Sequence, residues 1–121
     1  MKEYKAKLED KVSRLVHEFQ SQQLGERASS VKTVIFGDVL SILARDCLSR
    51  GERDFVADDS NWRLLQENKS RAFEMVKDKL VSKLEDALGC KITNVYSVID
   101  KSGIRFELVI LNKNLEKELS G

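Results

Sequence analysis

The stretch from Ser60 to Gly89 carries a long helical pattern, and this pattern limits how the chain can fold. In its second half, apolar side chains recur at steps of three and four residues, which predicts an amphipathic helix with one buried face. These side chains are Phe73, Val76, Leu80, Leu84 and Leu88. Ser60 and Asn61 can cap its start, and Gly89 supplies the left-handed residue expected at its end. The polar interval 66–71 separates this face from Trp62–Leu65, so the helix either breaks there or extends beyond the core.

An amphipathic helix and a hairpin are predicted before this stretch. The first helix should end near Leu24-Gly25, and its apolar face consists of Leu8, Val12, Leu15, Val16 and Phe19. Residues 31–36 and 39–47 have strand composition and flank Gly37-Asp38, a two-residue turn signal. The second strand carries Leu40, Ile42 and Ala44 on one face and Val39 and Leu43 on the other. Because both faces are partly apolar, part of the second face should also be covered, which is a first indication of an intermolecular surface.

A short helix and a second hairpin complete the pattern. Ser49 and Glu52 have the spacing of a capping box, which predicts a short helix over residues 50–56. Residues 92–99 and 104–111 have strand composition and are separated by a tight turn. The last strand places Ile104, Phe106, Leu108 and Ile110 on one face and Arg105 and Glu107 on the other, before Val109 and Leu111 make its end apolar on both faces. The charged tail from residue 112 should fray or form a short helix.

The resulting order, helix, hairpin, helix, hairpin, predicts an α+β fold. The simplest arrangement is a two-layer sandwich in which both hairpins join one four-stranded, mainly antiparallel sheet with the helices on one face. A chain of 121 residues is long enough for one domain with its own core, and residues 1–121 should form a single domain.

The predicted lengths of the long helix and the strands do not match. Residues 61–88 would span roughly 40 Å as a helix, whereas a strand of seven residues spans about 23 Å. We therefore expect the Trp62–Leu65 end, together with the apolar outer positions of the second and fourth strands, to pack on a second copy in a homodimer.

Composition disfavours several classes of protein. Charged residues make up 34% of the chain but nearly cancel to a net charge of +1, which argues against nucleic-acid binding. No apolar run is long enough to span a membrane and no signal peptide follows the start, so the protein is expected to be cytoplasmic with no transmembrane segment of its own. The basic and acidic residues of the middle of the chain, Glu26, Glu52 and Lys69 among them, are interspersed and predict a mixed solvated surface.

No residue pattern indicates catalysis, a cofactor or a metal ion. His17 has no nucleophile or second carboxylate at a recognisable spacing, and is better interpreted as a helix-surface or boundary residue than as a general base. Asp58-Asp59 and Asp100 lack the pattern of a calcium loop and fit turns and caps. Cys47 and Cys90 lack CxxC spacing, which favours two reduced thiols over a metal site, although a disulfide between them stays open.

Four residues are candidates for an interface or a pocket. Trp62 is detached from the main apolar face, so it is either an ordinary core residue or an interface hot spot, with Leu65 beside it. Trp62, Arg71 and Tyr96 could also line a pocket between the sheet and the overhanging long helix.

From about Leu8 to Leu111, the chain resembles a bacterial family formerly labelled a domain of unknown function and now named after the MpsC component of a sodium-translocating, membrane-potential-generating system. The features that carry the resemblance are the first helix ending in Leu24-Gly25-Glu26-Arg27, the hairpin Val31–Asp38, Leu48-Ser49 with Glu52, Arg71, and the segment Asp86–Ile92. The resemblance implies association with membrane proteins of cation or bicarbonate uptake, and it brings no catalytic residues with it.

Together, these observations favour a non-enzymatic, soluble accessory or regulatory protein that supports a membrane cation or bicarbonate transport system, with a membrane subunit as a possible partner. A small-molecule or anion sensor is the alternative, and an enzyme is the least favoured class because paired carboxylates, histidine partners and an activated cysteine are missing from the pattern.

Overall fold

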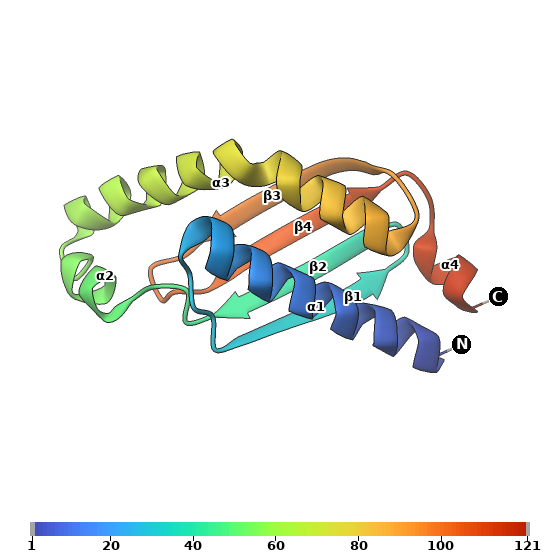
Figure 1. The fold of residues 1–121 in the computed structure, drawn as a ribbon. Coiled ribbons are helices and arrows are strands. Elements are labelled where there is room, and N and C mark those ends of the chain that lie inside the picture. The colour runs from blue at the N-terminus through green and yellow to red at the C-terminus, as the bar shows by residue number, and fades with distance from the viewer. Residues whose placement is uncertain (1, 121) are drawn as a thin grey trace.

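The computed structural model describes residues 2–120 and shows helices and strands in the predicted order (Figure 1). They are α1 (Lys2–Leu24), β1 (Ser30–Phe36), β2 (Val39–Arg45), α2 (Arg50–Phe55), α3 (Asp59–Leu88), β3 (Ile92–Ile99), β4 (Arg105–Leu111) and α4 (Leu115–Ser120). Of the two alternatives for the tail, the structure shows the short helix. The capping box at α2 is also confirmed, because Ser49 accepts from the Glu52 amide and Glu52 accepts from the Ser49 amide.

All four strands form one antiparallel sheet in the order β1-β2-β4-β3. Each hairpin pairs its own strands, and the pairing of β2 with β4 joins the two hairpins. Helices α1 and α3 contact each other and lie on the same face of the sheet, α1 against β1 and α3 against β3 (Figure 1). The predicted two-layer α+β architecture is therefore confirmed.

Helix α3 is continuous through the polar interval, so the alternative of a break is wrong. Its start also differs from the prediction: the cap is Asp58, whose Oδ1 accepts from the Ser60 amide at 2.9 Å, and Ser60 and Asn61 lie inside the helix. Asn61 instead donates to the carbonyl of Phe55, which ties the start of α3 to α2. At the other end, Gly89 has the predicted left-handed conformation, with φ of 68°.

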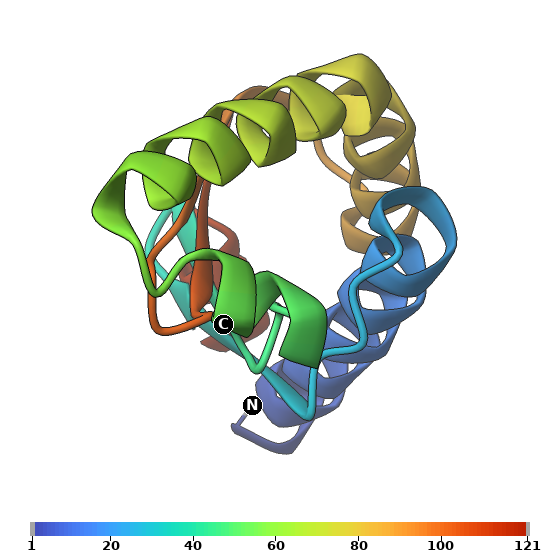
Figure 2. The same ribbon diagram turned by 90° about the vertical axis from the view of Figure 1, so that its left-hand side faces the viewer.

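The excess length of α3 covers a second, smaller core within the same chain. The first half of α3 extends beyond the strands towards α2, while its second half lies beside α1 (Figure 2). Under the second half lies what we call the main core, which includes Val12, Val16, Phe19, Ile35, Leu40, Phe73, Leu80, Leu84 and Val109. Under the first half lies what we call the end core, made of Ala28, Ala44, Cys47, Leu48, Val56 and Ile99, with Trp62 and Leu65 packed against it. The excess length of α3 thus has a packing role within the chain, and packing of the Trp62–Leu65 end on a second copy stays a prediction.

The buried face of β4 is the face that carries its charges. Arg105 and Glu107 are each 1% exposed and lie beneath the helices, followed on the same face by Val109 and Leu111. The other side of β4 carries no charged residue. From the sequence alone, that uncharged side would be expected to face the core. The structure places it outward, because Glu26, from another part of the chain, supplies a partner for the buried Arg105.

Candidate functional site

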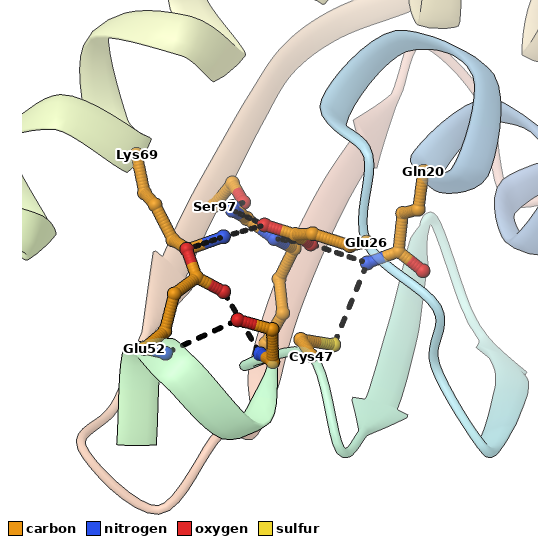
Figure 3. A network of polar contacts seen from close by, with 8 residues as sticks. Gln20, Glu26, Cys47, Glu52, Lys69 and Ser97 are labelled. Carbon is orange, nitrogen blue, oxygen red and sulfur yellow. Dashed lines mark hydrogen bonds and ion pairs between the residues drawn. The ribbon is translucent and has the colours of Figure 1, made fainter. Parts of the chain in front are cut away.

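Arg105 belongs to a buried ion cluster, and Figure 3 labels its neighbours Glu26, Lys69 and Ser97. Its guanidinium makes a bidentate contact with Glu26, with Nε 2.8 Å from Oε1 and Nη2 2.7 Å from Oε2. Its Nη1 donates to Ser97 Oγ on β3 at 2.8 Å, and the guanidinium carbon lies 5.7 Å from the centroid of the Phe73 ring. Burial alone would lower the pKa of Arg105, but the hydrogen bonds and charge of Glu26 outweigh burial and raise it. The guanidinium therefore stays charged in the interior.

Lys69 extends this cluster from α3 to α2. Its Nζ lies 3.1 Å from Glu26 Oε2 and 3.3 Å from Glu52 Oε2. Glu26 and Lys69 were predicted to belong to a solvated surface, and this prediction is wrong for both: Glu26 is 2% exposed, and the Lys69 side chain is 11% exposed. The polar interval of α3 thus supplies a cation to the interior. The signal that could have found the cluster was the pair of charges within β4, which needed partners.

Glu107 is buried next to the cluster and, within the described part of the chain, has no counter-charge of its own. Glu26 and Glu52 already balance Arg105 and Lys69, so an ionised Glu107 would add an excess negative charge. Among residues 2–120, its Oε2 has no hydrogen-bond partner. Burial raises the pKa of Glu107 to about 7, and the Glu26 carboxylate acts in the same direction, while Arg105 opposes it.

Gln20 and Cys47 border the cluster on the side of α1. Gln20 Nε2 lies 3.4 Å from Glu26 Oε1 and 3.9 Å from Cys47 Sγ. Both Cys47 and Cys90 are free thiols. Burial, followed by the charge of Glu26, raises the pKa of Cys47 to about 11, and burial also raises the pKa of Cys90. Because the thiolate is the reactive form, both cysteines are poor nucleophiles at neutral pH.

The ion cluster holds elements in place. Both oxygens of Glu26 are engaged by cations, and Arg105 uses three nitrogens on protein acceptors. The contacts connect the segment after α1 with α2, α3, β3 and β4. Such a buried network fixes one arrangement of its elements.

The opposite face of the sheet, which we call the open face, is lined by apolar side chains. Strand register aligns its residues in three rows across β1, β2, β4 and β3. The rows are Phe36-Val39-Ile110-Asn94, Val34-Ser41-Leu108-Tyr96 and Lys32-Leu43-Phe106-Val98. Phe36, Val98 and Tyr96 are 73%, 62% and 55% exposed. At the chain's average of 34% charged residues, about four of these twelve positions would be charged, yet only Lys32 is. An ordinary solvated face would carry more charge, so this face has the composition of a contact surface.

The four residues predicted for an interface or pocket are not brought together. Trp62 and Leu65 are partly buried against the end core, whereas Arg71 is exposed on α3. Tyr96 lies in the middle row of the open face, on the other side of the sheet from α3. Trp62, Arg71 and Tyr96 therefore do not line one pocket between the sheet and the long helix. A role for Trp62 and Leu65 in an interface stays a prediction.

The other candidate residues from the sequence, His17 and Asp100, make hydrogen bonds within the fold. A ring N–H of His17 donates to the carbonyl of Ala28 at 3.0 Å, between α1 and the segment that leads into β1. Asp100 accepts from the amides of Ser102 and Ile104 in the turn of the second hairpin. Within residues 2–120, no group of three or more His, Cys, Asp or Glu side chains is arranged to hold a metal ion. No helix in this part of the chain has both the length and the apolar character needed to cross a bilayer.

Comparison with known proteins identifies the family. The model of the family described as "MpsC: Na+-translocating membrane potential-generating system (MpsC)" matches residues 4–113, as the resemblance noted above predicts. No curated protein and no solved structure matches the chain. Because the match spans both hairpins, α2, α3 and nearly all of α1, the protein belongs to the MpsC family, whose description associates it with a sodium-translocating, membrane-potential-generating system.

Proposed function

We propose that this chain is a non-enzymatic accessory or regulatory protein that supports a membrane cation or bicarbonate transport system from the cytoplasmic side. It acts by binding protein, and the open face is its contact surface. Family membership supports the association with a sodium-translocating system.

The open face is the observation that carries this proposal. Nine of its twelve positions are apolar, and three of these apolar side chains are aromatic. Monomeric soluble proteins rarely expose a continuous apolar patch of this kind, and aromatic residues are enriched at protein interfaces. The buried ion cluster supports a non-enzymatic role, since its charged groups are engaged with one another.

Affinity purification from detergent-solubilised native membranes tests the proposal. The tagged wild-type protein should recover membrane subunits of a cation or bicarbonate transport system. Tyr96→Lys should reduce this recovery, because it places a charge in the middle row of the open face. Met75→Lys is the matched control: Met75 is 85% exposed on α3, so the same charge is added to the helical layer.

Two results would contradict the proposal. Recovery of soluble enzymes alone, with no membrane subunit in repeated experiments, would argue against an accessory role in transport. Equal loss of recovery in Tyr96→Lys and Met75→Lys would remove the open face from the explanation.

A sensor of small anions is a second candidate function, and one hollow on the surface supports it. The hollow has a volume of about 330 Å³ and is lined by Gly25, Arg27, Asp46, Cys47, Leu48 and Ser49. Arg27 could contribute a cation to a bound anion there, although the Asp46 carboxylate would oppose it. A thermal-shift screen with bicarbonate, phosphate and nucleotides tests this candidate, because a ligand that binds the native state raises the unfolding temperature. No shift at high ligand concentration would count against it.

A further inference from the structure

We propose that the open face binds the open face of a second copy, so that the protein works as a face-to-face dimer. Its two-fold axis lies between the two sheets and runs parallel to the strands, between β2 and β4. This inference rests on the proposed function and specifies how the open face serves it: the open face joins two copies, and the membrane subunit binds the assembled dimer, so that a charge at Tyr96 reduces recovery by breaking the dimer. It goes further by naming the occupant and the alignment of the two sheets.

The size of the face fits a small but specific dimer. Seven residues along a strand and four strands across give a flat area of about 23 Å by 19 Å, or roughly 440 Å² per copy. The accessible surface is larger than this flat area because it follows the contours of the side chains. The total surface buried by the two copies therefore comes close to or exceeds the ~1,000 Å² expected of a biological interface. A dimer of moderate affinity is therefore expected.

The central strands of the face are self-complementary about this axis. The two-fold rotation places each row opposite the same row of the partner, with the strands in reverse order. Strand β2 therefore packs on the partner's β4. Ser41 then faces the partner's Leu108, which sets the smallest side chain in the central part of the open face against a large one. The other two central pairs, Val39 with the partner's Ile110 and Leu43 with the partner's Phe106, bring apolar side chains together. Since facing side chains of two aligned sheets interdigitate, alternation of large and small residues favours close packing.

The outer strands are complementary about the same axis. Strand β1 packs on the partner's β3, so Val34 faces the partner's Tyr96 and Phe36 faces the partner's Asn94. Lys32 faces the partner's Val98 at the rim, where its ammonium group can stay in water. The two Lys32 side chains of the dimer lie at opposite edges, so no like charges meet.

A second copy fits this face better than a lipid surface does. Binding to anionic lipid depends on clusters of Lys and Arg, and the three rows contain one Lys, with Arg45 beyond them at the end of β2. With a formal net charge of +1, two copies of the chain repel each other weakly.

Sedimentation equilibrium of the purified full chain tests the dimer. Between about 1 and 100 µM, the mass should rise from 13.8 kDa towards twice that value. Val98→Lys should raise the dissociation constant by at least about tenfold, because it sets two like charges against each other at each end of the interface. Met75→Lys should leave the dissociation constant unchanged. Circular dichroism and thermal melts verify that each variant is folded.

The charge-reversed variant tests the alignment of the two sheets. Val98→Glu places a carboxylate opposite the partner's Lys32, so it should weaken the dimer less than Val98→Lys does. The double variant Lys32→Glu/Val98→Lys should recover affinity relative to Val98→Lys for the same reason. Equal weakening by Val98→Lys and Val98→Glu would overturn the alignment.

The two proposals fail in different experiments. A strict monomer at about 100 µM, or a dimer that folded Val98→Lys leaves intact, would overturn the face-to-face dimer even if membrane subunits are still recovered. A dimer that behaves as described but recovers no membrane subunit would support this inference and overturn the transport role.

Discussion

Replacing Glu107 with Gln should stabilise the protein at neutral and alkaline pH and leave it little changed in acid. Glu107 is buried without a counter-charge, and burial raises its pKa from the ordinary value of 4.5 to about 7. Between these two values the folded state holds a proton that the unfolded state has lost, so the wild-type free energy of unfolding falls as pH rises. Below the lower value both states are protonated, and above the upper value both are ionised.

The size of the effect follows from the two pKa values. At about 1.4 kcal/mol per pKa unit, the wild type loses roughly 3 kcal/mol of stability between pH 4.5 and 7 on account of this carboxyl. The Gln side chain has nearly the same shape as the protonated acid and does not ionise. The free energy of unfolding of Glu107→Gln minus that of the wild type should therefore be about 3 kcal/mol larger at pH 8 than at pH 4.5. This change corresponds to roughly 10 °C in Tm.

Urea denaturation of both proteins at several pH values between about 4.5 and 8 measures this difference. The other carboxyl groups are shared, so their contributions cancel in the comparison. Several of them, such as Asp46 and Asp100, have lowered pKa values and stabilise the fold above the acid range, in the opposite sense to Glu107. A stability difference that does not change with pH would refute the reasoning, because it would mean that Glu107 ionises alike in the folded and unfolded states.

Two further substitutions test the ion cluster and the end of α3. Arg105→Ala should lower the free energy of unfolding by about 3–5 kcal/mol, because it leaves Glu26 buried without its cation. Arg53→Ala removes an exposed ion pair and should lower it by at most about 1 kcal/mol. Equal losses of stability in urea denaturation would contradict a buried cluster. Gly89→Ala should destabilise by about 1–2 kcal/mol because φ is 68° there, while Gly51→Ala in α2 should be neutral or stabilising by about 0.5 kcal/mol, since its added Cβ meets no other atom. Thermal melts in which both glycine variants shift in the same direction by the same amount would contradict this contrast.

The elements of the fold follow from local sequence signals. The apolar steps in α3, the turn signal at Gly37-Asp38 and the capping box of Ser49 and Glu52 each depend on residues a few positions apart. The two-layer arrangement then follows from the order of the elements. The cap of α3 was misplaced because Asp58, Asp59, Ser60 and Asn61 are all residues that favour caps, and the backbone selects among them only in the folded chain.

The buried face of β4 could not be predicted in the same way. An alternation of Phe106, Leu108 and the charged Arg105 and Glu107 gives no local reason to bury the charges. Burial becomes possible because Glu26, 79 residues away, supplies a bidentate partner for Arg105. Because the charged side of β4 is buried, its apolar side chains face outward as part of the open face. The location of the open face therefore also depends on contacts between residues distant in sequence.

The open face was indicated in part by the sequence. Both sides of the second strand were apolar, and the structure shows that Val39 and Leu43 do lie on the side away from the helices. The expectation of a homodimer at the Trp62–Leu65 end had a different basis, the excess length of α3. Because the end core accounts for that length, the reason for a second copy at this end is weaker, while the reason for one on the open face is stronger.

The division of the interior into two cores has a consequence for how the molecule opens. The ion cluster lies between them: Arg105 pairs in the sheet with Ala44 and Ile99 of the end core, while its guanidinium faces Phe73 of the main core. Helix α2 has no buried residue and closes the smaller side. Partial unfolding should therefore start at α2 and the first turns of α3, with fast amide exchange there and slow exchange in β2 and β4. The chain would then rearrange at one end while its sheet, and the surface that the sheet presents, stays intact.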